Sequence, residues 1–248
     1  MTDDNLTDKP QPLVAHLTEL RDRLIKCLLA VLILFVALVS FSAEIYTFVA
    51  APLQAYFPES TGMIATEVAS PFLAPFKLTL ILAVILAIPL ILHQIWSFIA
   101  PGLYNREKKI GIALLLSSIV LFYAGLAFAY FVVFPLVFGF FTSIAPEGVT
   151  VMTDINHYLN FVLKLFFAFG VAFEIPIATI LLIKVGVTTP DQLAANRAYV
   201  VVGCFVIGML LTPPDVISQT MLAIPVWLLF EAGIFFGRLM VKPEASTE

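Results

Sequence analysis

Charged residues are scarce in this sequence: Asp, Glu, Lys and Arg make up 12% of its 248 residues, about half the share of a soluble domain. Histidine is also rare, with three isolated copies that suggest no metal site. The two cysteines, Cys27 and Cys204, lie in apolar runs without a CxxC pair, so we expect free buried thiols. Catalytic and cofactor motifs are missing too: there is no HExxH, GxSxG, Walker or GxGxxG pattern.

Hydrophobic residues, by contrast, make up 61% of the chain and include 23 Phe. A soluble protein could not hide so much apolar surface, because the fraction that folding buries is limited by surface-to-volume scaling. The chain is therefore predicted to be embedded in a membrane, which argues against nucleic-acid binding and against a secreted disulfide scaffold. Without an ATP site, any work it does must come from a gradient or a partner.

The apolar runs are continuous rather than alternating, which predicts spanning helices instead of barrel strands. A helix needs about 20 apolar residues to cross about 30 Å of hydrocarbon. We predict an all-α membrane protein with one six-helix domain at 12–240, between disordered segments at 1–11 and 241–248. The spans are expected at 24–43, 77–97, 110–134, 159–183, 197–211 and 217–236.

Three apolar runs have unusual lengths. The uncharged stretch 110–146 is too long for one crossing, so we expect Pro135 to divide it into a span and an interfacial extension at 136–144. The last two runs, 198–211 and 216–230, are each about 15 residues, or near 22 Å. Spans this short thin the bilayer or recruit partner helices.

Basic residues are distributed asymmetrically. Eleven of the thirteen Lys and Arg residues lie in the N-terminal arm, the loops at 98–109 and 184–197, and the C-terminal tail. By the positive-inside rule this predicts cytoplasmic termini and an even number of spans. The other two, Lys77 and Lys164, lie near span entrances, where a long side chain reaches the interface. The acidic N-terminal arm is unlike the start of a signal peptide, so we expect the first span to be retained.

Two segments on the predicted cytoplasmic side carry carboxylates. Leucines at helical spacing predict an amphipathic helix before the first span, and Glu19 and Arg23 are four residues apart on it. In the loop after the second span, Phe98 is expected at the headgroup level, and Glu107 is the only acid among basic neighbours. Either these carboxylates pair with nearby Lys and Arg on a solvated surface, or they are exposed for a cationic ligand.

Glu174 is the polar residue most out of place, because it lies in the middle of the fourth span beside Pro176. A charge there costs about 3 kcal/mol even on lenient insertion scales, and the proline interrupts the helical hydrogen bonds. We predict a kink and a polar pocket, with a neutral Glu174 that donates a hydrogen bond. The acceptor is either a neighbouring helix or a docked single-span subunit.

The sixth span also has polar residues near its ends. Asp215 follows two prolines and is predicted to cap this helix, with Gln219 in its first turn. Glu231, toward the other end, is expected at the membrane interface.

Four segments resemble motifs of one known family. Residues 16–24 read HLTELRDRL, 97–107 read SFIAPGLYNRE, 169–176 read FGVAFEIP, and TPPD at 212–215 is followed by Ser218 and Gln219. In this order they are similar to the HLxELRxRL, SFIxPGLYxxE, FGxxFExP and last outer-loop motifs of the TatC family, the multi-spanning receptor subunits of the twin-arginine protein translocase. The resemblance covers roughly residues 12–240.

The resemblance implies a receptor in the bacterial inner membrane that binds the twin-arginine signal peptides of folded proteins. It implies TatA-like and TatB-like single-span partners, self-association in the complex, transport driven by the proton-motive force, and neither enzyme activity nor a cofactor. It assigns Glu19, Arg21, Phe98 and Glu107 to signal-peptide binding, Glu174 to the membrane interior, and Pro52, Asp215 and Gln219 to the outer-loop and partner-contact regions.

The alternative is a proton-coupled secondary transporter of a small solute, which would use Glu174 as a relay in a broken helix. Spans 1–3 and 4–6 differ in length, however, so no inverted repeat is evident. A third class, an intramembrane enzyme, finds no nucleophile–base pair in the sequence.

Overall fold

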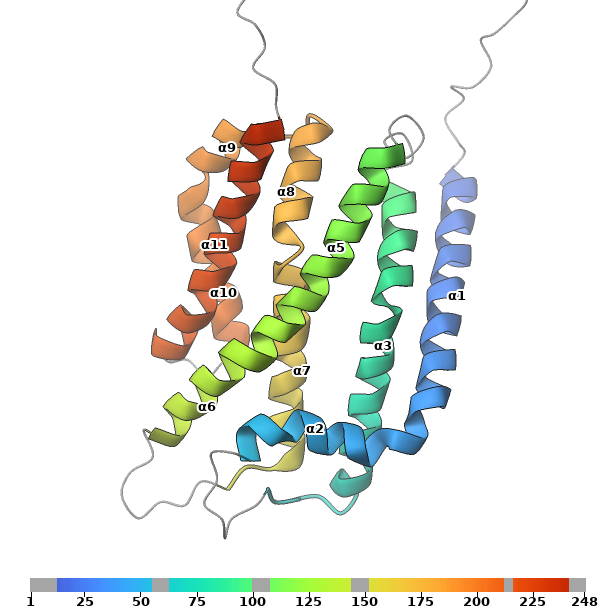
Figure 1. Ribbon diagram of the computed structural model, residues 1–248, viewed down its shortest axis with the longest axis vertical. Coiled ribbons are helices and arrows are strands. Elements are labelled where there is room, and N and C mark those ends of the chain that lie inside the picture. Colours follow the sequence, from blue (N-terminus) through green and yellow to red (C-terminus); the bar gives the residue numbers. More distant parts are fainter. Residues whose placement is uncertain (1–12, 55–62, 100–107, 144–151, 212–215, 241–248) are drawn as a thin grey trace, which may run out of the picture.

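The computed structural model describes residues 13–54, 63–99, 108–143, 152–211 and 216–240, and most of these are helical (Figure 1). Five helical segments are long and apolar enough to cross a membrane: Leu17–Ala51, Ser70–Phe98, Gly111–Ser143, Ile155–Lys184 and Gln219–Leu239. A sixth, Arg197–Leu211, is apolar but short, as predicted. The described residues therefore form an all-α membrane protein, and the terminal segments 1–12 and 241–248 lie outside the description.

The spanning helices stand side by side and define two ends of the bundle (Figure 1). At one end, here called the near end, α1 (Leu13–Leu38) begins and α11 (Val216–Met240) ends. At the opposite end, the far end, α2 (Ser42–Gln54) lies across the bundle. Successive spans alternate between these two ends.

The first span was predicted to end at residue 43, but the chain remains helical beyond it and forms α2. A short 3-10 turn, Val39–Phe41, follows α1, and the chain then turns into α2. Tyrosine hydroxyls from other helices donate to carbonyls of α2: Tyr130 to Phe48 at 3.0 Å and Tyr158 to Val49 at 2.8 Å. This helix depends on contacts with distant parts of the chain, which hydropathy does not reveal.

The long apolar stretch was predicted to divide near Pro135 into a span and an interfacial extension, and the structure changes helix type just before this proline. Helix α5 (Lys108–Phe128) passes through a π-helical turn, Ala129–Val133, into α6 (Phe134–Ser143). The wider turn ends at Val133, two residues before Pro135, in the segment where a regular helix would clash with the proline ring. The segment therefore crosses the bundle as one tilted helical element (Figure 1).

The other helices follow the prediction more closely. Helix α3 (Ser70–Ile99) begins seven residues before the predicted boundary. The expected kink in the fourth span is confirmed, because α7 (Ile155–Ala172) ends and α8 (Ile175–Lys184) starts on either side of Phe173 and Glu174.

The C-terminal helices complete the bundle. A short α9 (Pro190–Ala195) leads into α10 (Arg197–Leu211), which is the short fifth span. Helix α11 is longer than the apolar run from which it was predicted. The prediction of a short sixth span was therefore wrong, because Gln219–Leu239 is long and apolar enough to cross a membrane even though it contains Glu231, which pairs with Arg197.

Helix α7 is the centre of the packing. It buries eight of its residues, among them Leu165 and Phe169, whose side chains are at most 1% exposed. Its crossing with α5 is close, because a methyl group added to Gly125 would lie 2.5 Å from the carbonyl oxygen of Phe169. Small residues permit such approaches between membrane helices, where van der Waals contact drives association.

Candidate functional site

At the near end, α1 and α3 run antiparallel and are joined by the side chain of Arg23. The guanidinium donates to Glu19 Oε1 at 3.0 Å through Nε and at 2.5 Å through Nη2, so the predicted pairing of these residues is confirmed. It also donates to Gln94 Oε1 on α3 at 3.1 Å. Glu19 remains 41% exposed, whereas Arg23 is 21% exposed.

The remaining signal-peptide candidates lie around this contact. Arg21 points elsewhere, because its guanidinium pairs with Asp22 at 2.8 Å and is 67% exposed. Phe98 is four residues past Gln94 and Glu19 is four residues before Arg23, which places both one turn closer to the near end. Glu107 lies outside the described residues; α5 begins at the next residue, Lys108.

This arrangement presents a carboxylate to the solvent at a fixed position. A carboxylate accepts two parallel hydrogen bonds from a guanidinium, which an ammonium group cannot supply in the same geometry. Both bonds from Arg23 go to the same oxygen of Glu19, Oε1, so Arg23 does not bond the other oxygen, Oε2. The near end of α1 is therefore chemically suited to a guanidinium-bearing ligand.

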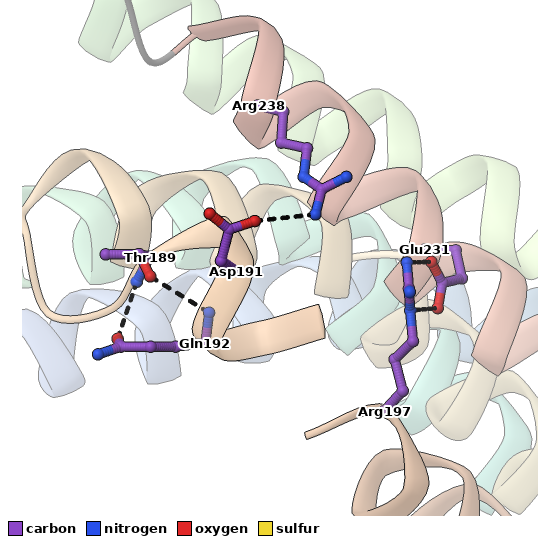
Figure 2. Close-up of polar contacts among 6 residues, drawn as sticks. All are labelled: Thr189, Asp191, Gln192, Arg197, Glu231 and Arg238. Carbon is purple, nitrogen blue, oxygen red and sulfur yellow. Dashed lines mark hydrogen bonds and ion pairs between the residues drawn. The ribbon is translucent and has the colours of Figure 1, made fainter. Parts of the chain in front are cut away.

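A second set of ion pairs at the near end connects α9, α10 and α11 (Figure 2). Arg197 forms a two-pronged pair with Glu231, with both donor–acceptor distances at 2.6 Å. Arg238 donates to Asp191 at 3.0 Å. The turn before α9 is closed by a capping box between Thr189 and Gln192. Glu231, which was expected to be interfacial, therefore ties two spans together.

In the middle of the bundle, Glu174 lies at the break between α7 and α8. The hydroxyl of Ser118, a fully buried residue of α5, donates to Glu174 Oε2. The other oxygen, Oε1, is buried and has no hydrogen-bond partner among the described residues. Glu174 also lines a groove between α3 and α7. The predicted polar position inside the membrane is present, and a neighbouring helix supplies one partner.

The far end is held by a network around Asp154. This carboxylate caps α7 through the backbone N–H groups of Asn156 and His157. It also accepts the Thr66 hydroxyl at 2.7 Å and the Thr66 N–H at 2.9 Å. The bonds from Thr66, and then those from α7, hold the pKa of the Asp154 carboxyl well below its usual range. A parallel bridge between Ile64 and Asp154 reinforces the same contact.

The outer-loop candidates are only partly described. Pro52 belongs to α2, and Asp215 lies outside the described residues. Gln219 lies in the first turn of α11, where its amide donates to the carbonyl of Phe205 on α10 at 2.6 Å. In this structure Gln219 therefore holds α10 against α11.

Several polar contacts were missed from the sequence. Three uncharged residues inside apolar helices form hydrogen bonds with ionisable side chains. Gln94 accepts from Arg23, Ser118 donates to Glu174, and Asn160 accepts from Lys77. A search for every polar side chain within a span, rather than for charges alone, would have found them.

Comparisons with known proteins agree with this architecture. The family model for Sec-independent protein translocase protein (TatC) matches residues 15–225. The TatC protein of Azotobacter chroococcum mcd 1 is 64% identical over 243 residues, which cover 97% of this chain and 95% of that protein. The TatC protein of Escherichia coli (strain K12) is 57% identical over 238 residues, covering 96% and 92%.

A solved structure shows the same fold. A crystal structure of the twin arginine translocase receptor TatC superposes with a TM-score of 0.80 at 43% identity, covering 90% of this chain and 98% of that one. Sequence and backbone thus match over nearly the whole length. The chain belongs to the TatC family of Sec-independent protein translocase proteins, components of protein transport rather than enzymes.

Proposed function

We propose that the chain is the receptor of a twin-arginine translocase in the bacterial inner membrane, with both termini in the cytoplasm. The near end, where α1 begins, then faces the cytoplasm. Signal peptides of folded proteins bind there, with their two arginines on Glu19 and Glu107, and Arg21 and Phe98 complete the site. The observation that carries this proposal is the exposed carboxylate of Glu19, whose neighbour Arg23 is fixed by Gln94.

The energetics require more than two ion pairs. An exposed guanidinium–carboxylate pair contributes about 0–1 kcal/mol, so the arginines provide selectivity rather than most of the affinity. The apolar segment of the signal peptide supplies the rest by burial along the bundle, at about 25 cal/mol per Å². Arg23 orients the Glu19 carboxylate through the ion pair, while leaving it 41% exposed for a second guanidinium.

The test is binding of a labelled twin-arginine signal peptide to the purified full chain at fixed salt. We expect Glu19→Ala plus Glu107→Ala to weaken binding about tenfold, and Glu107→Lys to weaken it further because it adds repulsion. A peptide with paired lysines should bind less well, since ammonium groups lack the planar fork.

Glu44→Ala is the matched control, because Glu44 lies in the first turn of α2 at the far end. The Glu44→Ala variant should bind the signal peptide with the same affinity as the parent. Unchanged affinity in the double variant would remove the assignment of Glu19 and Glu107.

We also place the docking of single-span TatA-like and TatB-like subunits on α10, with transport driven by the proton-motive force. Helix α10 is 15 residues, or about 22 Å, and it exposes Val202, Val206 and Leu210. A short apolar helix leaves the bilayer thinned, and an added helix relieves this. Pro52, Asp215 and Gln219 belong to the adjoining outer region in this proposal.

Cysteine crosslinking tests the docking surface. Cysteines at exposed positions of α10 should crosslink to a single-span partner more strongly than cysteines at 30–40 on α1. Equal crosslinking at both helices would argue against a preferred edge.

A further inference from the structure

A groove of about 760 Å³ runs between α3 and α7 on the surface of the bundle. This volume lies within the range of about 300–1,000 Å³ that is usual for small-molecule sites. Its walls are branched aliphatic and aromatic side chains such as Val84, Ile88 and Phe167. Polar side chains lie at two places: Lys77, Asn160 and Lys164 toward the far end, and Glu174 deeper in the membrane.

The two lysines form one cationic site. Lys77 Nζ donates to Asn160 Oδ1 at 2.5 Å, which holds the ammonium group of α3 against α7. Asn160 and Lys164 are four residues apart on α7 and so are neighbours on the same helix face. Both lysines are exposed, and neither has a carboxylate partner among the described residues.

The depth of this site matches a lipid phosphate. Helix α3 has 30 residues, or about 45 Å, so about 7 Å at each end extends beyond about 30 Å of hydrocarbon. Lys77 lies seven residues, about 10 Å, from the far end of α3, and Lys164 lies nine residues, about 14 Å, into α7. Both ammonium groups therefore reach the far-end interface on their four-carbon stems.

We propose that this groove binds an anionic phospholipid of the leaflet at the far end. The phosphate lies between Lys77 and Lys164, and one acyl chain follows the apolar walls toward Glu174. Two cations without a carboxylate partner among the described residues favour a net negative headgroup, because the cationic group of a zwitterionic lipid would be repelled. The apolar lining selects a lipid over free phosphate, which would leave the groove unfilled.

The experiment is native mass spectrometry of the purified full chain in detergent, titrated with phosphatidylglycerol or with phosphatidylcholine. We expect phosphatidylglycerol to bind about tenfold more tightly than phosphatidylcholine. Lys77→Gln plus Lys164→Gln should reduce that preference to about twofold or less. Lys26→Gln, which removes an exposed lysine in the middle of α1 and outside the groove, is the matched control and should keep the full preference.

Two further measurements are needed. One distinguishes a lipid from a free phosphate compound as the ligand, and the other tests whether the lysine variants have simply misfolded. Val84→Trp narrows the groove without touching the lysines and should weaken lipid binding, whereas competition by glycerol phosphate should be negligible. Lys77→Arg plus Lys164→Arg should retain the preference, which shows that charge rather than fold is being measured. Equal binding of both lipids, a preference that survives the double Gln variant, or displacement by glycerol phosphate alone would each overturn the proposal.

Discussion

Helices α7 and α10 both cross the membrane, yet they are positioned by different interactions. Helix α7 buries eight of its residues, crosses α5 at Gly125, and is capped at the far end by Asp154. Helix α10 buries only Cys204 and Gly208 among its own residues. It packs along α11 alone for most of its length, with Gly208 close to Gln219, and two polar contacts add to this packing: the Arg197–Glu231 ion pair at its start and the Gln219–Phe205 hydrogen bond near its middle.

This difference suggests a division of roles. A helix fixed by close backbone contact cannot shift without losing many van der Waals contacts at once. A helix that buries two residues and packs mainly on one neighbour leaves most of its apolar surface open, so it can accept another helix without losing its own packing. In the proposed receptor, α7 is then the fixed frame and α10 the edge that accepts partners.

The largest expected effect is at the break in α7. Glu174→Ala should reduce export of a twin-arginine reporter in cells more than tenfold, because it removes the buried carboxyl and leaves the Ser118 hydroxyl without its partner. Glu174→Gln should keep substantial export, since an amide preserves a hydrogen-bond donor and an acceptor. Cys204→Ala on α10 is the control and should export normally.

The outcomes distinguish two roles for this residue. Both Glu174 variants should bind signal peptide at the near end with the affinity of the parent. If Glu174→Gln abolishes export as completely as Glu174→Ala does, the carboxyl must titrate during transport, and a proton relay becomes the better explanation. If Glu174→Ala exports like the parent, the carboxyl is merely tolerated.

The next effect compares two glycines. Gly125→Ala places a methyl group 2.5 Å from the Phe169 carbonyl oxygen, so α5 and α7 must separate. We expect a loss of about 1–3 kcal/mol, seen as a lower Tm in detergent. Gly203→Ala on α10 meets nothing within 4 Å and should keep or raise the Tm, because alanine favours a helix. Equal effects of the two substitutions would contradict the proposed contrast in packing.

A smaller effect is expected at the far-end cap of α7. Asp154→Asn keeps the size of the side chain but removes the charge that Thr66 and the α7 N–H groups bind, so the Tm should fall by about 2–4 °C at pH 7. Thr47→Val is the control, because that hydroxyl bonds only within its own helix, to the carbonyl of Ala43.

The pH dependence of this cap has a definite sign. The folded-state pKa of Asp154 lies below the ordinary aspartate value of about 3.9, so its stabilising contribution is present above that value. It is lost as the pH falls from about 4 toward the lower folded-state pKa. The Tm difference between parent and Asp154→Asn should therefore be constant above pH 5 and shrink below pH 4; a constant difference down to pH 3 would contradict the assignment.

The sequence predicted those parts of the fold that hydropathy and charge encode. The kink at Glu174 and Pro176 and the short fifth span followed from a polar residue, a proline and a short apolar run. Helix α2 and the π turn before Pro135 did not follow, because each depends on how the chain packs on itself. The candidate site shows the same difference between local and long-range contacts. The Glu19–Arg23 pair is local and was predicted, whereas the contact of Arg23 with Gln94, 71 residues away, was not.

The smallest expected effect concerns the ion pairs that anchor α10 and α11 at the near end. Arg197–Glu231 is two-pronged and its carboxylate is 24% exposed, so a double-mutant cycle with Arg197→Gln and Glu231→Gln should give a coupling of about 0.5–1 kcal/mol in Tm-derived stability. Arg238–Asp191 involves a 90% exposed carboxylate and should show no measurable coupling. High salt should reduce the first coupling, because partly exposed charges are screened. A coupling at Arg238–Asp191 equal to that at Arg197–Glu231 would show that exposure does not decide these energies, and it would remove the reason for treating the Arg197–Glu231 pair as the near-end anchor of α10.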